Sequence, residues 1–566
     1  MSTLPADYPP PFSPSDYIVT PKAAEDERID VGVLIVGAGP AGLATAVRLG
    51  QLLGEDPELL EQLGEVPIAV AEKGKGPGSH LLSGAVMRPG PIKRLFPDTP
   101  ESEIPHYGEV TGESVYFMMS KGKLRIPTPP QMKNHGNWVV SISQLARWMS
   151  DQAEELGAFL LPETDCQKLI IDQGRVMGVV TGDKGRGRDG EELSAFEPGA
   201  EVHAQVTVIA EGTPGHLAGI TRKHFDLDRD SVQTWELGVK EVWEVPTPLR
   251  KVIHTLGWPL RLQPKYREYG GSWIYPMGDD KISLGYVIGL DYADANLSCH
   301  DVLQQFKTHP FIADILKGGK RLAWGAKTIP GGGLYGLPSR FHVPGAVLVG
   351  DSAGFVDMMA LKGVHHAIHS GMLAAEGIYE ALKAGKATTP AGLWGYSARV
   401  RDSSIWKELW KVRNIRPAFQ KGFLYGGMVH GMATTSFGHA PRKRVKAKTD
   451  TREPVFLAGD RAAAYPKPDG QLTFDKLSSV FASGNATRDD QPNHIRLQRH
   501  VPVELATTWV RMCPAQVYEL DDDATRNGTV TVKINPSNCV QCGAITAKGG
   551  RLTPPEGGSG PEYTLT

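Results

Sequence analysis

The feature that most constrains the fold is a glycine-rich turn between an apolar segment and a helix-like segment, VGVLIVGAGPAGLATAVRLGQLL at residues 31–53. Gly37, Gly39 and Gly42 form a GxGxxG pattern there. The first glycine permits a tight turn, the second lets a pyrophosphate approach the backbone, and the third lets the helix pack closely on the strand. Glu72 ends the next expected strand, VPIAVAE, where its carboxylate can accept hydrogen bonds from ribose hydroxyls. These residues predict a Rossmann-like dinucleotide-binding domain.

A later apolar segment favours FAD as the dinucleotide. In VLVGDSAGF, Asp351 is expected at the end of a strand and Gly354 at the start of a helix. A carboxylate at this position suits the ribityl chain of a flavin. A helix N-terminus suits the electron-rich pyrimidine edge of the flavin ring system. The two segments together predict an FAD site built on Gly37, Gly39, Gly42, Glu72, Asp351 and Gly354.

Length and composition exclude several other classes of protein. At 566 residues the chain is long enough for roughly three or four domains. Its 61 Lys and Arg nearly balance its 63 Asp and Glu, so no overall positive field attracts nucleic acid. Five cysteines are too few and too clustered for the disulfide framework of a secreted protein. No run of about twenty strongly apolar residues predicts a membrane-spanning helix, although attachment to a bilayer surface stays open.

Three histidines lie close together in the segment KGVHHAIHSG, at positions 365, 366 and 369. Their spacing could place imidazoles on one face of a helix. The glutamate of an HExxH motif is absent, which argues against a hydrolytic zinc site. We therefore interpret this segment as a helix that packs beside the flavin.

Several segments together resemble the electron transfer flavoprotein:ubiquinone oxidoreductase family. They are VLIVGAGPAGLATAVRLGQL, HLLSGAVMRPGPIKRLFPD, NHGNWVVSISQLARWM, VIAEGTPGHLA, KGVHHAIHSGMLAAE, YPKPDGQLTFDKLSSV, CPAQVYE, INPSNCVQC and PEGGSGPEY. The segments occur in the family's order and cover nearly all of the chain after about residue 30. The resemblance implies a membrane-surface iron-sulfur flavoprotein that passes electrons from electron transfer flavoprotein to a quinone, with no acid-base dyad or nucleophile of its own.

The fold class implied is a multidomain α/β and α+β chain. Its expected parts are a mobile N-terminal extension (1–28), a Rossmann-like FAD-binding domain of the glutathione-reductase type (29–245, completed by 340–390), a β-sheet quinone-binding domain (246–339), a helical and membrane-surface region (391–499) and a small ferredoxin-like iron-sulfur domain (500–566).

The family's quinone contact falls on Gly270 and Gly271 in EYGGSWIY. Backbone amides there can hydrogen-bond a quinone carbonyl, and the absence of a Cβ atom lets the ring approach. Without the resemblance, the pair would be interpreted equally well as a glycine turn between strands. The resemblance implies ubiquinone or menaquinone as the electron acceptor and electron transfer flavoprotein as the donor.

A contact with a membrane is expected in the helical region. Residues 422–441 contain no Lys, Arg, Asp or Glu, and the segment RKRVKAK that follows carries five positive charges. Such a segment can lie in the bilayer interface while the cations face anionic head groups. The alternative is a solvated basic loop. We expect a peripheral or monotopic protein on the cytoplasmic face of the inner membrane.

Three cysteines near the C-terminal end are the candidate metal ligands. Cys513 precedes the CxxC formed by Cys539 and Cys542. The family places four cysteines on a 4Fe-4S cluster, as one upstream cysteine followed by CxxCxxC, and here the fourth position falls on Ile545. Isoleucine has no lone pair, so the ligand count favours a 3Fe-4S cluster.

Other outcomes for this cysteine site stay open. A four-iron cluster could take water or Thr546 at its fourth iron, or the site could hold zinc or no metal. The remaining cysteines, Cys166 and Cys299, lie in distant segments and are expected to be buried thiols.

Two alternative functions share the predicted flavin fold. One is a geranylgeranyl-reductase-like enzyme that acts on isoprenoid double bonds, which does not require the cysteine-containing segment. The other is a flavin-holding scaffold without a working cluster.

Overall fold

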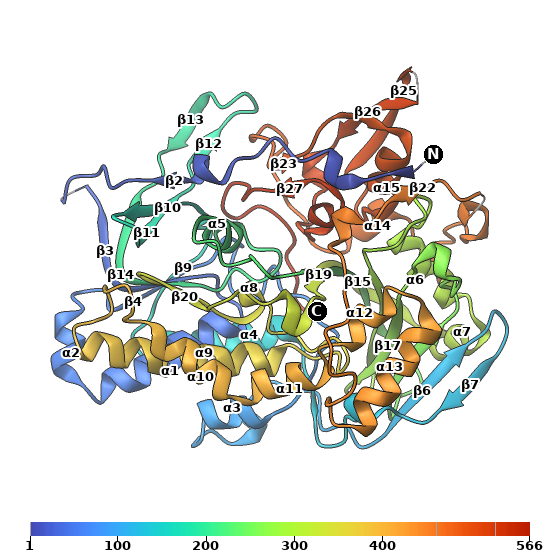
Figure 1. Ribbon diagram of the computed structural model, residues 1–566, viewed down its shortest axis with the longest axis horizontal. Helices are drawn as coiled ribbons and strands as arrows, with labels where there is room; N and C mark the ends of the chain where they lie inside the picture. The colour runs from blue at the N-terminus through green and yellow to red at the C-terminus, as the bar shows by residue number, and fades with distance from the viewer. Residues whose placement is uncertain (1, 26, 460, 527) are drawn as a thin grey trace.

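The computed structural model describes residues 2–25, 27–459, 461–526 and 528–566. It contains two large sheets and a smaller C-terminal unit. Figure 1 shows the two sheets side by side, and hydrogen bonds join the C-terminal unit to residues beside each of them.

The first sheet forms around the glycine-rich turn. β3 (Ile29–Val36) pairs in parallel with β4 (Ile68–Ala71) and β14 (Glu201–Ile209), and β14 pairs in parallel with β21 (Ala346–Leu348). The last six residues of β3 are buried, because a parallel strand covered on both faces needs a continuous apolar run. The predicted succession of strand, glycine turn, helix and strand is therefore confirmed. The sheet also contains β2 (Ile18–Val19), β9 (Phe159–Leu161), β10 (Cys166–Asp172), β11 (Arg175–Thr181) and β20 (His342–Val343).

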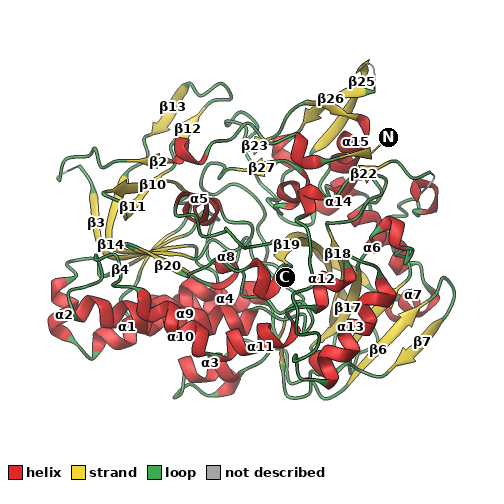
Figure 2. Ribbon diagram, viewed as in Figure 1, coloured by secondary structure: helices red, strands yellow, loops and turns green. Residues whose placement is uncertain are grey.

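Helices cover one side of this sheet. α1 (Pro40–Gly54) packs against α9 (Val364–Lys383) and α4 (Ile142–Glu155). Leu43 and Val47, one turn apart on α1, are fully buried, as expected for the apolar face of a helix that packs on a core. Figure 2 shows α1 and α9 together below the strands. Shorter helices of this unit are α2 (Pro57–Gln62), α3 (Gly90–Leu95), α5 (His216–His224) and α8 (Gly350–Ala353).

The second sheet has the order β19-β15-β18-β17-β16-β6-β7. β17 (Gly270–Met277) and β18 (Lys281–Gly289) are antiparallel neighbours within the range predicted to form a sheet. The sheet exceeds the predicted domain limits of 246–339, because β6, β7 and β15 lie outside them. β6 joins by parallel pairing with β16, and local periodicity carries no signal for a pairing so distant in the chain. The other elements are β6 (Glu113–Met118), β7 (Lys123–Ile126), β15 (Trp235–Glu244), β16 (Val252–Gly257), β19 (Lys320–Pro330), α6 (Cys299–Lys307) and α7 (Pro310–Leu316).

Four helices follow α9 and pack beside both sheets. They are α10 (Trp394–Asp402), α11 (Ser404–Val412), α12 (Ile415–Phe419) and α13 (Phe423–Thr435). Within the described ranges, none of the helices combines the length and the apolar character needed to cross a bilayer.

The C-terminal unit packs around one tryptophan. Trp509 on α15 is fully buried, and its Nε1 donates a hydrogen bond to the carbonyl of Lys548 at 2.7 Å. The bond ties α15 to the short 3₁₀ helix η10, which carries the end of the cysteine segment. The elements are α14 (Lys476–Phe481), α15 (Val503–Met512), η10 (Ala544–Lys548) and the strands β23 (Ile495–Arg496), β24 (His500–Pro502), β25 (Tyr518–Arg526), β26 (Thr529–Ile534) and β27 (Arg551–Leu552).

The N-terminal segment differs from the mobile extension predicted over residues 1–28, of which residues 1 and 26 lie outside the described ranges. β1 (Ser2–Thr3) pairs with β22 (Val455–Phe456), and β2 pairs with β10. Phe12 and Tyr17 stack with ring centroids 5.0 Å apart, and Tyr17 meets His216 edge-on. These strand pairings and aromatic contacts give the segment defined partners.

A composite cavity and a cysteine cluster

One cavity of about 650 Å³ reaches all three units of the fold. The first sheet contributes the glycine-rich turn, Glu72 and Asp351, and the second contributes the paired glycines of β17. The C-terminal unit closes the wall with Gln541, Thr546 and Arg551. A cavity of this size suits an organic cofactor or substrate of many atoms.

The glycine-rich turn has the shape that a pyrophosphate needs. Gly37 has φ +109°, and a Cβ atom there would lie 2.5 Å from the carbonyl oxygen of Ala210. A Cβ on Gly42 would lie 2.1 Å from the carbonyl of Gly37, so this glycine lets α1 pack on β3. At Gly39 the nearest atom is 3.8 Å away, so the second glycine leaves its side of the turn open. Gly37 and Gly42 therefore leave no room for a side chain, whereas Gly39 leaves open space beside the turn.

Glu72 is held at the end of its strand by two backbone amides. Its Oε2 accepts a hydrogen bond from the amide of Ala38 at 3.0 Å, and its Oε1 accepts one from Gly74 at 2.7 Å. The carboxylate consequently lies next to the glycine-rich turn and lines the cavity.

Asp351 lines the cavity, but Gly354 does not open a helix as predicted. α8 is a single turn that Gly354 ends with φ +95°, and a Cβ atom there would face Leu337 and Gln233. The next helix, α9, begins at Val364, and its N-cap Gly363 lines the cavity. A one-turn helix followed by a loop resembles a helix start in sequence, which explains the error.

Burial controls the charge of Asp351. It raises the pKa of this carboxyl to about 6, and the hydroxyl of Thr213, 3.5 Å away, opposes the shift by donating a hydrogen bond. The carboxyl can therefore donate or accept a hydrogen bond near neutral pH.

Gly270 and Gly271 lie inside a strand, not in a turn. Gly270 has φ +153°, and a Cβ atom there would lie 2.0 Å from the carbonyl oxygen of Val287. A Cβ on Gly271 would lie 2.5 Å from the carbonyl of Thr255. Both positions exclude any side chain, and both line the cavity. The alternative of an ordinary glycine turn is therefore wrong.

Two charged residues of the cavity wall were not singled out from the sequence. Glu236 is fully buried; its Oε1 accepts a 2.5 Å hydrogen bond from Arg416 Nε, and among the described residues its Oε2 has no partner. Burial raises the pKa of Glu236 and lowers that of Lys327 to about 8. A charged residue inside an apolar strand pattern, as in WELGV and WGAKT, is the signal that could have identified them.

The three candidate ligand cysteines lie in the C-terminal unit, where Cys513 and Cys539 share one apolar core and Cys542 packs against it. Burial, followed by the thiol of Cys513, raises the pKa of Cys542 to about 12. The pKa of Cys539 is raised by burial and by both of these thiols. The three sulfur atoms do not all lie within 4.8 Å of one another. Buried thiols that influence one another suit a metal centre, because a metal removes the protons and neutralises the charge.

The cysteine loop is attached to the cavity wall. The carbonyl of Cys542 accepts hydrogen bonds from both the amide of Thr328, at 2.9 Å, and its hydroxyl, at 2.8 Å. Thr328 lies on β19 and lines the cavity. A group bound by the cysteines would therefore lie near a group bound in the cavity.

Ile545 occupies the place expected for a fourth cysteine. Its side chain is 3% exposed, and a Cβ atom on Gly550 would lie 2.3 Å from its Cγ1. The side chain fills space and offers no ligand atom. Next to it, the hydroxyl of Thr546 is buried and has no hydrogen-bond partner within the described residues.

The two other cysteines are buried, as predicted. Cys299 is nevertheless less remote than its position in the sequence suggested, because it belongs to the same apolar core as Cys513 and Cys539. The thiol of Cys542 contributes to the raised pKa of Cys299, after burial. Cys166 lies in β10 of the first sheet.

Comparison with known proteins gives two family matches. Residues 235–329 match the ETF-QO ubiquinone-binding family, and residues 470–564 match the 4Fe-4S family of electron transfer flavoprotein-ubiquinone oxidoreductase.

Relatives span nearly the full chain. The mitochondrial electron transfer flavoprotein-ubiquinone oxidoreductase of Caenorhabditis elegans is 36% identical, covering 96% of this chain and 92% of the relative. The electron transfer flavoprotein-ubiquinone oxidoreductase of Pseudomonas aeruginosa is 37% identical, and the match covers 95% of this chain and 99% of the relative.

A solved structure shares the fold. A geranylgeranyl bacteriochlorophyll reductase-like protein from Thermoplasma acidophilum has a TM-score of 0.51 at 18% identity, covering 73% of this chain and 96% of that one.

Proposed function

Because this chain belongs to the electron transfer flavoprotein-ubiquinone oxidoreductase family, we propose that its composite cavity is where electrons from electron transfer flavoprotein reach ubiquinone. The chain is an oxidoreductase with FAD and an iron-sulfur cluster as cofactors. FAD, when bound, exchanges one or two electrons and the cluster exchanges one, which suits a donor of single electrons and an acceptor of two. The observation that carries the proposal is the single cavity that joins the glycine-rich turn, the paired glycines and the cysteine-bearing unit.

The two alternative functions have less support. Relatives of the same name match over nearly the whole chain, including the cysteine-containing unit, whereas the geranylgeranyl reductase-like structure shares the fold alone.

For FAD, we assign the pyrophosphate to the turn of Gly37, Gly39 and Gly42, and the adenosine ribose to Glu72. Asp351 would hydrogen-bond the ribityl chain. The N-terminus of α9 at Gly363 takes the place next to the flavin ring that the sequence had given to Gly354. The open side of Gly39 and the buried carboxyl of Asp351 support this arrangement.

For the quinone, we assign the ring to Gly270 and Gly271. The support is their close packing, which leaves a backbone surface where a planar ring can approach. From there the cavity continues to Phe423, Gly427 and His430 on α13, an apolar route for an isoprenoid tail.

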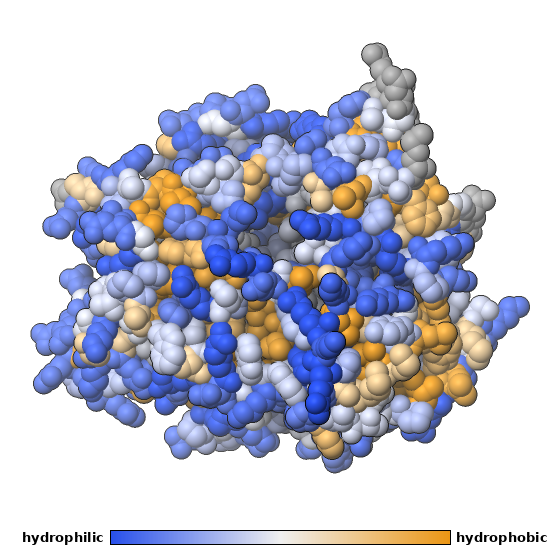
Figure 3. Space-filling model, in the orientation of Figure 1, coloured by the Kyte–Doolittle hydropathy of each residue, from blue (hydrophilic) through white to orange (hydrophobic). Residues whose placement is uncertain are grey.

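We assign the outer face of α13 to the membrane surface. Leu424 is 87% exposed, and the five cations of residues 442–448 are all exposed close by in the chain. Figure 3 shows apolar residues in the area where Figure 1 places α13. Each cation near an anionic bilayer contributes about 1 kcal/mol. We propose peripheral attachment, on the cytoplasmic face of the inner membrane.

For the cysteine centre, we propose a 3Fe-4S cluster held by Cys513, Cys539 and Cys542. Support comes from the shared apolar core of these cysteines and from the inert side chain of Ile545. Protein purified without oxygen and then oxidised should give the paramagnetic resonance signal of a three-iron cluster, with three irons per chain. A silent oxidised spectrum with four irons would contradict the proposal, and loss of the fourth iron in Cys299→Ser would then identify Cys299 as the missing ligand.

The function is tested with the full chain, reduced electron transfer flavoprotein and a short-chain quinone. We expect flavin bleaching followed by quinone reduction, with ubiquinone and menaquinone analogues compared. If the donor reduces the bound FAD but no quinone reoxidises it, the assignment is contradicted.

A further inference from the structure

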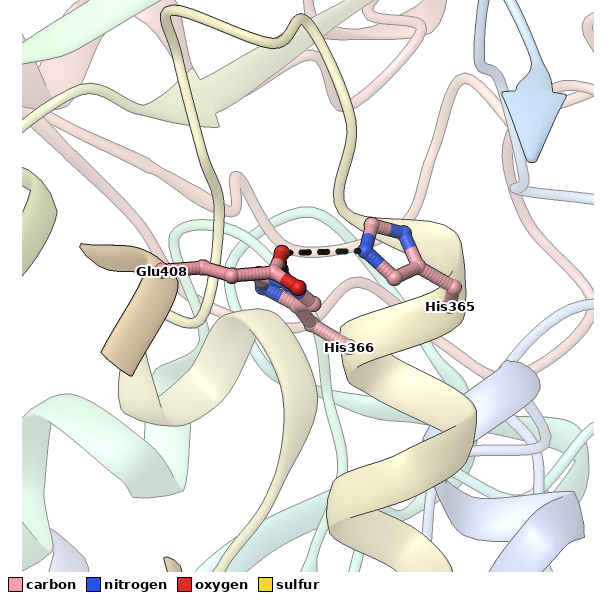
Figure 4. Close-up of side chains that lie close together, drawn as sticks. All are labelled: His365, His366 and Glu408. Carbon is pink, nitrogen blue, oxygen red and sulfur yellow. Dashed lines mark hydrogen bonds and ion pairs between the residues drawn. The ribbon is translucent and has the colours of Figure 1, made fainter. Parts of the chain in front are cut away.

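A second set of metal-ligating side chains lies where α9 meets α11. His365 and His366 belong to the first turn of α9, and Glu408 lies in the middle of α11. Figure 4 shows both imidazoles directed toward the carboxylate. The Nε2 atoms of His366 and His365 lie 3.0 and 3.7 Å from Glu408 Oε2, and one ligand atom from each residue lies within 4.8 Å of the others.

His365 lacks the hydrogen bonds that a buried imidazole normally makes. It is 5% exposed, and within the described residues neither of its ring nitrogens has a hydrogen-bond partner. The Nδ1 of His366 also has none. An unsatisfied buried polar group costs about 1–3 kcal/mol, so this pair of imidazoles calls for an explanation.

The spacing suits an ion between the side chains. At 3.7 Å, His365 Nε2 is too far from Glu408 Oε2 for a hydrogen bond. Zinc binds imidazole nitrogen and carboxylate oxygen at about 2.0–2.2 Å, so two ligand atoms on one ion stand roughly 3–4 Å apart. Two histidines and one glutamate are also the ligand set of open zinc sites, which leave a fourth position for water.

Arg88 is the competing cation. Its Nη1 donates a 2.5 Å hydrogen bond to Glu408 Oε2, the same oxygen that His366 contacts. Outer-sphere hydrogen bonds to a ligating carboxylate are common, but a positive charge this close weakens the binding of a second cation. The side chains of Arg88 and Glu408 are 37% and 25% exposed, which gives an ion a path to the site.

We propose that His365, His366 and Glu408 bind a divalent transition-metal ion, with zinc as the best-fitting candidate. The ion joins α9 to α11 at the end of α9 that faces the cavity. The HExxH comparison did not reveal the site because one ligand comes from a different helix. The proposal does not depend on the electron-transfer assignment.

The test uses the full chain with its flavin and iron-sulfur cofactors bound, stripped of loose metal with a chelator and titrated with Zn²⁺. We expect one zinc per chain by calorimetry and elemental analysis, and at least tenfold weaker binding in both His366→Gln and Glu408→Gln. His369→Gln is the matched control on the same helix. Its Nδ1 contacts the hydroxyl of Ser404 and not Glu408, so zinc binding should be unchanged.

Substitution with Co²⁺ separates this site from the cysteines. A nitrogen and oxygen site gives visible d–d bands without the thiolate charge-transfer band that cysteine ligands produce. Arg88→Gln should tighten zinc binding several-fold, because it removes the cation bound to the same carboxylate. FAD content and circular dichroism check that each variant folds. The proposal is overturned if the parent does not bind one zinc per chain. It is also overturned if all the variants bind zinc with the affinity of the parent.

Discussion

At the residue scale, Gly270 and Gly271 show how a backbone surface is kept free of side chains. Each excludes a Cβ atom because a carbonyl oxygen of a neighbouring strand lies within 2.5 Å of the place it would occupy. The sequence identified both glycines only through family resemblance. The structure supplies the physical reason for them, since the strands pack too closely for any other residue.

We expect Gly270→Ala to reduce quinone reduction by at least tenfold while FAD stays bound. The added methyl forces β17 away from β18 and costs of order 1–3 kcal/mol in stability. Gly278→Ala is the control, because φ there is +77° but the nearest atom to its Cβ is 4.0 Å away. Steady-state kinetics and thermal unfolding measure the two effects. Equal loss of activity in both variants would show that strain alone is responsible.

Asp351 should make the stability of the apoprotein depend on pH. The folded protein keeps the proton up to a pKa of about 6, whereas the reference value for the unfolded chain is 3.8. Between these values the folded state binds more protons, so this group lowers the free energy of unfolding as pH rises. The free energy of unfolding of Asp351→Asn should therefore rise relative to that of the parent across this window, by about 3 kcal/mol at pH 7. Urea unfolding from pH 4 to 7 checks this, with the exposed Asp279→Asn as control.

At the element scale, α13 lines the cavity with one side and exposes apolar side chains on the other. Its inner side reaches the cavity through Phe423, Gly427 and His430, and its outer side exposes Leu424 and Met428. Absence of charge over residues 422–441 was visible in the sequence. The division into two faces was not, because glycines interrupt the apolar pattern.

Replacing Leu424 with Asp should abolish binding to anionic vesicles while FAD content stays normal. Leu424 is 87% exposed, so the change costs little folding stability but opposes insertion into the bilayer. Phe481→Asp on α14 is the matched control, because Phe481 is as exposed as Leu424 but lies in another unit. Vesicle co-sedimentation is the measurement. Equal loss in both variants would indicate a general defect and contradict the assigned face.

The cysteine loop and η10 offer a gain-of-ligand test. We expect Ile545→Cys to supply a fourth thiolate and convert the centre to a 4Fe-4S cluster, so that the oxidised protein loses its paramagnetic signal. Ile545→Val keeps an apolar side chain and should leave the spectrum unchanged. An unaltered signal and iron content in Ile545→Cys would show that this position cannot reach the cluster.

At the scale of the whole molecule, the N-terminal segment bridges separate units. β2 joins the first sheet, and the guanidinium of Arg551, in the C-terminal unit, lies 4.0 Å from the ring centroid of Phe12. We expect Phe12→Ala to cost about 1–3 kcal/mol, because it removes a partly buried ring and a cation–π contact. Thermal unfolding of the holoprotein measures this. Leu60→Ala, at a site 37% exposed on α2, should change stability by much less.

The sequence predicted what depends on local pattern and missed what depends on distant contacts. GxGxxG followed by Glu72 carries its own structural context, so the unit of β3, α1 and β4 could be predicted from the sequence. Gly354 was misplaced because a one-turn helix and a full helix begin alike. Glu236 and the β6–β16 pairing depend on neighbours far along the chain, and no spacing rule within one segment reports them.

The composite cavity also sets an order of assembly. Gly37 and Arg551 line the same cavity although more than 500 residues separate them. During synthesis, the nascent chain presents its glycine-rich turn long before the segment that closes the wall has left the ribosome. Tight retention of the flavin is therefore expected only after translation is complete. Chains that stop early would expose the apolar cavity and become targets for proteases.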